Sequence, residues 1–171
     1  MTSLATLRLK KNEDRRLRAG HLWVFSNEID IARTPLDAFE PGAAVNIEDS
    51  RGKIIGSGYV NPHSLICARI ISHTPQQVLD ADLLSHRISQ ALTLRDHLFE
   101  QPCYRLIFGE GDKLPGLVVD RYAAILVVQI TTAGMERVKN TILDVLRKLL
   151  APEAILLRND NAMRTLEGLP T

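Results

Sequence analysis

The sequence has little of what marks a membrane, secreted or metal-binding protein. No uninterrupted apolar run comes near the roughly 20 residues of a membrane span. The N-terminal residues carry charges without an apolar signal core before them. Cysteine is scarce: the chain has two, Cys67 and Cys103. They give neither a disulfide framework nor a paired metal spacing. These absences predict a cytoplasmic protein without a membrane segment, a structural disulfide or a metal.

Net charge is also low, at +1, so overall electrostatics does not indicate a nucleic-acid partner. The distribution of charge is more informative. Six basic residues fall within one short segment, opposed there by Glu13 and Asp14: Arg8, Lys10, Lys11, Arg15, Arg16 and Arg18. Such a cluster is consistent with a phosphate-binding patch or with a solvated helix face, and its pattern alone leaves both open.

The apolar fraction of 45% and the length of 171 residues suit one ordinary domain or two small ones with a real core. In the first half, alternation and turn residues predict short strands and one small helix over 12–20, with Asn12 as its N-cap and Gly20 at its C-terminal turn. Trp23 lies in an alternating stretch, which predicts a core side chain. The strand ranges are 6–10, 43–49, 53–60 and 64–72. This arrangement predicts a compact barrel-like β domain over residues 1–74.

The second half, residues 75–171, changes to a mixed pattern. Apolar residues at helical spacing predict a helix over 80–99 and an amphipathic helix from Val138 that Pro152 ends. Four strands are expected, over 104–108, 116–122, 123–130 and 153–160. The last eleven residues have neither a helix nor a strand signature. Helix, strands, helix and strand together predict a small two-layer α/β domain, so that the whole chain is α+β.

One stretch resembles a cofactor loop: FGEGDKLPGLVVDRY, over 108–122. A dinucleotide-type loop needs a strand, then glycines, then a helix whose N-terminus faces the anion. Here Pro115-Gly116 breaks the chain again and a β-branched, strand-like segment follows. The stretch therefore predicts a connection between two antiparallel strands rather than a cofactor cradle.

The remaining inventory for catalysis is thin. Cys67 lies in a strand and is expected in the core, and Cys103 has no base beside it in sequence. The five histidines have no metal-ligand spacing. Asp120-Arg121 fits either a functional pair or a structural ion pair. The residues alone therefore show no active site.

Four stretches, taken together and in order, resemble one family: RLKKNEDRRLRAGHLWVFSNEI, GSGYVNPHSLICARI, GEGDKLPGLVVDRY and RNDNAMRTLEGL. The chain resembles, over essentially its whole length, the N-terminal part of the S-adenosylmethionine-dependent large-subunit rRNA cytosine-C5 methyltransferases. The resemblance implies a PUA-type RNA-binding pseudo-barrel followed by a small α/β middle domain. It also implies that a Rossmann-like domain, with the cofactor loop and the nucleophilic cysteine, lies outside this chain. Neither Cys67 nor Cys103 matches the family's catalytic motif.

The resemblance sets the expectations for the sites. It implies no catalytic, cofactor-binding or metal-binding residue here, and S-adenosylmethionine as the cofactor of the full-length family that this chain does not bind alone. The expected partner is RNA, ribosomal in origin. RNA contacts are expected from Lys10, Lys11, Arg15, Arg16, Arg18, His21, Asn61 and Arg69. An interdomain or substrate cleft is expected at Asp120, Arg121, Tyr122, Arg158, Asp160 and Arg164, for which an interdomain salt-bridge set is the alternative.

Three functions stay open at this point. The chain is the substrate-handling part of an RNA methyltransferase and inactive alone, or a free-standing PUA-type RNA-binding module without catalysis, or a protein-interaction scaffold whose basic helix is merely solvated. Reading the coding sequence past Thr171 separates the first two, and RNA binding at several salt concentrations separates the third.

Overall fold

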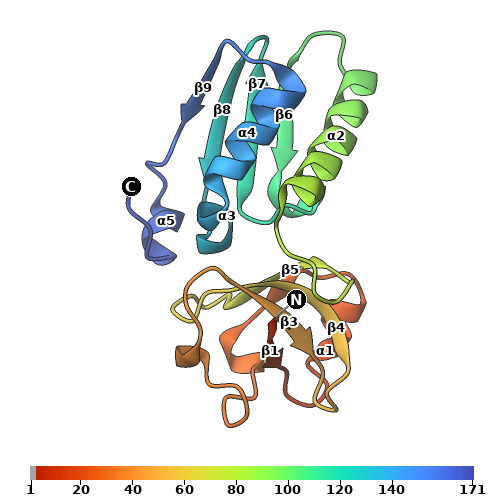
Figure 1. The fold of residues 1–171 in the computed structure, drawn as a ribbon, viewed down its shortest axis with the longest axis vertical. Helices are drawn as coiled ribbons and strands as arrows, with labels where there is room; N and C mark the ends of the chain where they lie inside the picture. Colours follow the sequence, from red (N-terminus) through yellow and green to blue (C-terminus); the bar gives the residue numbers. More distant parts are fainter. Residues whose placement is uncertain (1–2) are drawn as a thin grey trace. The chain divides into compact units, whose positions relative to one another are not determined.

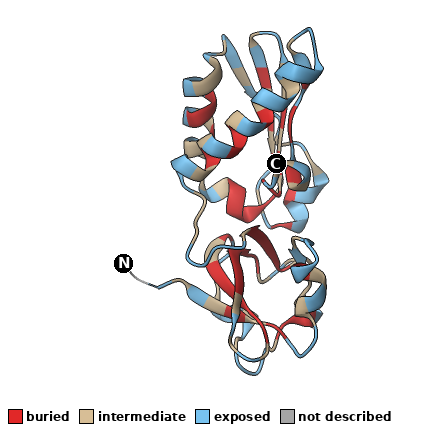
Figure 2. Cartoon of the chain, turned by 90° about the vertical axis from the view of Figure 1, so that its right-hand side faces the viewer, coloured by how far each residue is buried: buried red, intermediate tan, exposed pale blue. Residues whose placement is uncertain are grey.

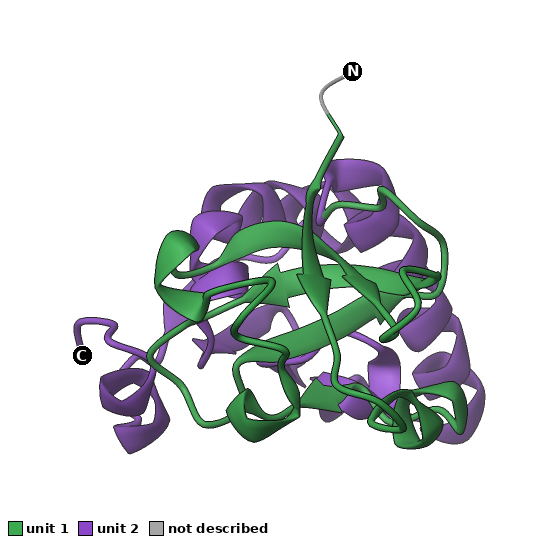
Figure 3. Cartoon of the chain, turned by 90° about the horizontal axis from the view of Figure 1, so that it is seen from below, with its two compact units in different colours: residues 1–78 green, residues 79–171 purple. Residues whose placement is uncertain are grey.

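A computed structural model describes residues 3–171 of the protein (Figure 1). The chain forms two compact units, which meet in sequence between Val78 and Leu79 (Figure 3). The sequence places its boundary four residues earlier, between 74 and 75. Each unit has a hydrophobic core of its own, so each is described by itself.

Unit 1 is built around a five-stranded sheet in the order β1-β3-β4-β5-β2. The strands are β1 (Ala5–Arg8), β2 (Trp23–Val24), β3 (Ala43–Glu48), β4 (Ile54–Val60) and β5 (Ala68–Ser72). β1 pairs with β3 in parallel and the other pairs are antiparallel. Alternate apolar residues point to one side and make the core, which includes Leu7, Val45, Ile47 and Ile70.

Local geometry in unit 1 differs from the prediction at two places. Asn12 has a left-handed backbone with φ of 73°, so it is not the N-cap. The helix α1 (Asp14–Arg18) begins later and is capped by Glu13 without a side-chain bond. The prediction that Trp23 is a core residue is wrong, because 40% of it is exposed. On the two-residue strand β2, Val24 takes the inward position and Trp23 the outward one.

Unit 2 has two layers. Its sheet has the order β6-β7-β8-β9, with β6 (Cys103–Phe108), β7 (Leu117–Tyr122), β8 (Ile125–Ile130) and β9 (Ala154–Leu157). The helices α2 (Ala81–Leu98) and α4 (Lys139–Leu150) lie on one face of that sheet, with their buried sides toward it (Figures 1 and 2). Leu84, Ile88, Ile142 and Leu146 supply the helix side of the core. The predicted two-layer arrangement is confirmed.

Two short helices of unit 2 have no counterpart in the prediction. They are α3 (Ala133–Arg137), just before α4, and α5 (Ala162–Leu166), in the C-terminal tail. Asn161 caps α5, since its side-chain oxygen accepts a bond from the Met163 N–H at 2.8 Å. The expectation that a Rossmann-like domain lies outside this chain stays a prediction.

Candidate functional site

A strongly charged concave surface lies in unit 1, between α1 and the turn that joins β3 to β4. We call it the basic hollow. It has a volume of about 680 Å³ and is lined by Lys11, Asn12, Asp14, Arg15, Arg18, Asp49, Ser50, Arg51 and Lys53. Five of these side chains are cationic and two are anionic, so the hollow carries an excess of three positive charges on a chain whose net charge is +1.

Asp49 holds the turn side of the hollow in place. Its Oδ1 accepts the N–H groups of Arg51 at 2.9 Å and Lys53 at 3.0 Å, and Gly52 takes the positive φ of 85° that the tight turn requires. The N–H of Lys53 is the largest cause that lowers the pKa of Asp49; burial opposes it, and Arg51 and Arg18 reinforce it. The carboxylate therefore stays ionised, and the turn stays closed, well below neutral pH.

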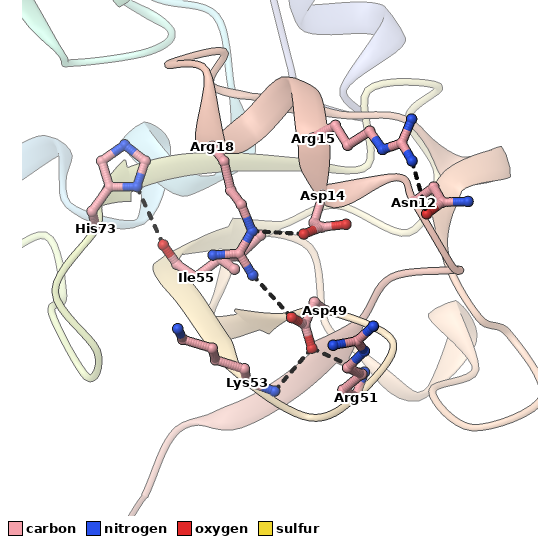
Figure 4. A network of polar contacts seen from close by, with 9 residues as sticks. All are labelled: Asn12, Asp14, Arg15, Arg18, Asp49, Arg51, Lys53, Ile55 and His73. Atoms are coloured by element: carbon pink, nitrogen blue, oxygen red, sulfur yellow. Dashed lines mark hydrogen bonds and ion pairs between the residues drawn. The ribbon is translucent and has the colours of Figure 1, made fainter.

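Arg18 links the helix to that turn. Its guanidinium lies between two carboxylates, with Asp14 Oδ2 at 2.6 Å and Asp49 Oδ2 at 2.9 Å (Figure 4). The bond to Asp14 is the main cause that raises the pKa of Arg18. Because its charge is matched by two partners, Arg18 positions the hollow's walls more than it adds free charge.

The other four cations of the hollow are exposed: Lys11, Arg15, Arg51 and Lys53. Arg15 makes one long contact, to Asn12 Oδ1 at 3.4 Å. None of the ion pairs between residues 3 and 171 involves these four side chains. They are the groups that can meet an anion in solvent.

The remaining predicted RNA contacts lie outside the hollow. Arg16 donates to Glu28 Oε1 at 2.7 Å and to the Trp23 carbonyl at 3.2 Å, and it lies over the Phe25 ring at 5.1 Å. Lys10 Nζ donates to the Asn27 carbonyl at 2.8 Å, and His21 is exposed. The structure thus divides the basic segment into a half that faces solvent and a half that helps to fix the chain between α1 and η1 (Ser26–Glu28).

Asn61 and Arg69 are buried, with 1% and 5% of their surface exposed. Asn61 Oδ1 accepts the His63 N–H at 3.2 Å, and Arg69 donates to the Ile66 carbonyl at 3.4 Å. Both residues therefore order the segment between β4 and β5, and this placement favours a structural role for them.

The residues predicted to line a cleft in unit 2 form separate local groups. Asp120 receives two bonds from Arg105, at 2.8 and 3.1 Å, and Arg121 donates to the Tyr104 hydroxyl at 2.9 Å. Tyr122 is 56% exposed.

The groups nearer the C-terminus differ from each other in burial. Arg158 pairs with Asp160 at 3.2 Å on the surface. Arg164 is 1% exposed, and its guanidinium donates to the carbonyls of Ile130 and Pro170 and to Glu136. Its Nε and Nη1 groups are thus bonded within unit 2.

The glycine loop connects two antiparallel strands, β6 and β7, as predicted. Residues Gly109–Asp112 make one 3-10 turn, η3, and Lys113 follows with a left-handed backbone. The Asp112 carboxylate accepts the Phe108 N–H at 2.7 Å and two bonds from Arg95, at 2.7 and 2.8 Å. A strand follows this loop, so the loop lacks the helix N-terminus that faces the anion in a dinucleotide-type loop.

Other sites for chemistry are no better supported. Cys67 is fully buried, as predicted, and burial raises the pKa of its thiol to about 12. The thiol is therefore not a nucleophile near neutral pH. Among residues 3–171, no group of histidine, cysteine and acidic side chains could hold a metal ion. No helix in that range is both long and apolar enough to cross a membrane.

Sequence reasoning missed Asp49, Arg51 and Lys53. The turn at Ser50-Arg51-Gly52 is an obvious hairpin signal, and two basic residues around one glycine are the clue to charge at that point. What the sequence does not show is that this turn lies beside α1, more than thirty positions away in the chain.

Comparison with known proteins gives this geometry a context. Residues 7–73 match the family described as PUA-like domain. The chain is 35% identical over 165 residues to "Ribosomal RNA large subunit methyltransferase I" of Yersinia pseudotuberculosis serotype O:1b, and 36% identical over 164 residues to the protein of the same name of Escherichia coli O127:H6. These matches cover 95% and 94% of the chain and 41% of each relative.

Solved structures agree on the fold. A candidate S-adenosylmethionine-dependent methyltransferase from Streptococcus mutans matches with a TM-score of 0.74 and 15% identity, over 91% of this chain and 41% of that one. The protein SMU.776, solved with SAH, matches with a TM-score of 0.75 and 14% identity, over 91% of this chain and 40% of that one. Residues 7–73 thus match the PUA-like domain family, and the chain is similar, over about two-fifths of their length, to proteins named ribosomal RNA large subunit methyltransferase I.

Proposed function

We propose that this chain is the RNA-binding, substrate-positioning portion of an S-adenosylmethionine-dependent methyltransferase that forms 5-methylcytosine in large-subunit ribosomal RNA in the cytoplasm. The observation that carries the proposal is the 35–36% identity to rRNA methyltransferases along nearly the whole chain. The chain spans 41% of those relatives, so the methyl donor and the reacting cysteine belong to the rest of the enzyme in this proposal, and the chain alone is inactive.

The basic hollow is the surface that we assign to RNA. Its exposed cations, Lys11, Arg15, Arg51 and Lys53, suit the phosphate backbone, and such contacts supply affinity and register without reading sequence. Arg18 and Asp49 keep the two walls in fixed relation. A methyltransferase acting on a base must hold that base out of its stack, at a cost of a few kcal/mol, and backbone contacts made elsewhere can offset it.

The division of labour follows from the chemistry of the proposed reaction. C5 of cytosine is a poor nucleophile, and a thiolate that adds at C6 would make C5 reactive toward a methyl donor. Within residues 3–171 the two thiols are Cys67, which is buried and protonated, and Cys103, which is exposed on a strand of unit 2. We therefore assign the holding of RNA, and not the methyl transfer, to this chain.

Reversal of charge at Arg15 and Arg51 tests the hollow. The R15E/R51E variant should bind a large-subunit rRNA fragment more weakly, and the magnitude of the slope of log affinity against log salt should fall by about 1.4 to 1.8, since each lost phosphate contact removes about 0.7 to 0.9 of slope. Filter binding at several salt concentrations measures both quantities. Arg16 is a poor choice for this test, because its bonds to Glu28 and Trp23 would be lost as well.

R33E is the matched control. Arg33 is an exposed arginine of the same unit outside the hollow, with 62% of its side chain accessible and a long contact of 3.7 Å to Asp30. It makes the same change of charge as each of the two substitutions in R15E/R51E, and half of their total. A salt slope that R15E/R51E leaves unchanged, or that R33E lowers equally, would remove the hollow from the proposal.

The reaction is tested in cells. Deleting the gene should abolish one 5-methylcytosine in large-subunit rRNA, which mass spectrometry of rRNA fragments detects, and the gene restored in trans should return it. If every methylated cytosine persists, the methyltransferase assignment fails, and a free-standing PUA-type RNA-binding module takes its place.

A further inference from the structure

The sheet of unit 2 has a second face that neither α2 nor α4 covers, opposite the core. We call it the open face. Strand pairing shows which residues share it. Tyr122 lies beside Ile125 and Cys103 in one row, and the next row joins Arg105, Asp120, Val127 and Leu156. Residues that alternate with these, such as Val119 and Val128, are buried on the helix side.

The open face is apolar and carries no unmatched charge. Phe108 joins this face, because it pairs with Val118 two positions from Asp120 and its ring lies under the Arg105 guanidinium. Phe108 and Leu156 are each 60% exposed, Tyr122 56% and Ile125 45%. Its ionic groups, Arg105 and Asp120, neutralise each other through two bonds at 2.8 and 3.1 Å. Contiguous apolar surface of this kind marks a site of interaction rather than ordinary solvent-facing sheet.

Its chemistry favours a protein surface over RNA. Affinity for RNA comes largely from cations that meet phosphates, and the one arginine of these two rows is already paired with a carboxylate. The core of a protein–protein interface is typically apolar and aromatic, and its charged groups are few and paired. The tyrosine, phenylalanine and leucine around the Arg105–Asp120 pair fit that composition.

We propose that a longer methyltransferase has its methyl-donor-binding part in the length of the relatives that this chain does not match, and that the open face docks that part. The inference rests on the proposed function. The chain matches 41% of each relative, so the larger part of such an enzyme lies outside the match. In the proposed function, that part must be fixed in position relative to the RNA that unit 1 binds. A sheet that two helices support on its other face is a rigid docking surface for that part, and substrate positioning requires such rigidity.

Cys103 is a natural probe of this face. It is exposed and pairs with Tyr122, whereas Cys67 is fully buried in unit 1. A thiol reagent therefore reacts at the open face of the 171-residue chain and not in its core. Peptide mapping by mass spectrometry assigns the label to Cys103 even if other cysteines are present in a longer polypeptide.

The experiment compares the alkylation rate of Cys103 by iodoacetamide in the 171-residue chain and in the full-length product of the gene. Cys103 should react fast in the chain and at least about tenfold more slowly in the full-length protein, since the interface must open first. L156D should restore fast labelling in the full-length protein. L94D is its control, because Leu94 is an exposed leucine of α2, 52% accessible and away from this face.

Several results would overturn the proposal. They are equal rates in the two polypeptides, slow labelling in the 171-residue chain itself, protection that grows with its concentration, protection by RNA, or a gene product that ends at Thr171. The third would identify a second copy as the occupant, and the fourth RNA.

If the cell's rRNA has the gene-dependent 5-methylcytosine while Cys103 stays reactive, the docking fails and the proposed function stands. If Cys103 is protected and no methylation depends on the gene, the docking stands and the proposed function fails.

Discussion

At the scale of single residues, Arg164 shows how much one buried cation can organise. It is 1% exposed and lies 34 positions from Ile130, whose carbonyl accepts its Nη1 at 2.7 Å. Nη1 also donates to Glu136 at 2.9 Å, and Nε donates to the Pro170 carbonyl at 2.8 Å. Burial by itself raises the pKa of Glu136, but the bonds from Lys139 and Arg164 outweigh it and lower that pKa.

Removing Arg164 should therefore destabilise unit 2. We expect R164A to lower the free energy of unfolding by roughly 3 to 5 kcal/mol, since it leaves buried carbonyls and a carboxylate without their donor. R164K should lose less, because it keeps the charge near Glu136 but not the planar fork. Urea titration measures both. Equal stability of R164A and the parent would show that water replaces the guanidinium.

The contribution of Glu136 to the free energy of unfolding depends on pH in a definite direction. Glu136 has a lower pKa in the folded state than in the unfolded one, so its contribution is complete above about 4.5, its ordinary value, and is lost as pH falls through the folded value. The difference in free energy of unfolding between the parent and R164A should therefore be largest near neutral pH and should become smaller in acid.

Residue types alone could not predict these roles. Arg15, Arg16 and Arg18 look alike in sequence, yet Arg15 faces solvent, Arg16 pairs with Glu28 and Arg18 pairs with Asp49. Their partners lie 12 and 31 positions away. The sequence could predict a basic segment, but long-range pairing decides which of its charges face solvent without an ion-pair partner.

At the scale of elements, two of the three glycines in the loop between β6 and β7, Gly111 and Gly116, differ in the space around them. Gly116 has a left-handed backbone with φ of 83°, and a Cβ there would overlap Thr132 Oγ1 and lie 2.8 Å from Thr132 Cβ. Gly111 has room, since an added Cβ would meet one atom of Phe108 at 3.5 Å. The close approach at Gly116 sets where β7 begins beside β8.

These two positions make a matched pair of variants. G116A should lower the free energy of unfolding by roughly 2 to 5 kcal/mol, since a left-handed alanine and overpacking each cost about 1 to 3. G111A should stay within about 0.5 kcal/mol of the parent. Chemical denaturation of both variants under the same conditions measures the difference. Similar effects at the two sites would mean that Thr132 moves aside at little cost.

Elements with a strong period could be predicted, and short ones could not. The long helices α2 and α4 and the strands β3, β4, β7 and β8 follow from spacing, because one face of each is regularly apolar. The five-residue helices α3 and α5 are too short to show a period, and α5 depends on the buried Arg164. The two-residue strand β2 ends because the chain enters η1, where Glu28 accepts the Phe25 N–H.

At the scale of the whole molecule, the two units have separate hydrophobic cores. One is formed by residues between Leu7 and Ile70 and the other by residues between Leu84 and Leu146. The two units also differ in their spectroscopic signals. Trp23, the only tryptophan of the sequence, belongs to unit 1, whereas the helices of 18 and 12 residues belong to unit 2.

These separate signals make the independence of the units measurable. Tryptophan fluorescence should follow unit 1 in urea, and the helical circular dichroism should follow unit 2. G116A should shift the circular dichroism transition to lower urea and leave the fluorescence midpoint where it is, because the substitution acts within the core of unit 2 alone. The parent should then show two transitions that do not coincide, which a single cooperative domain does not. A parallel shift of both signals would show instead that the units unfold as one, and that RNA bound in unit 1 would stabilise unit 2 as well.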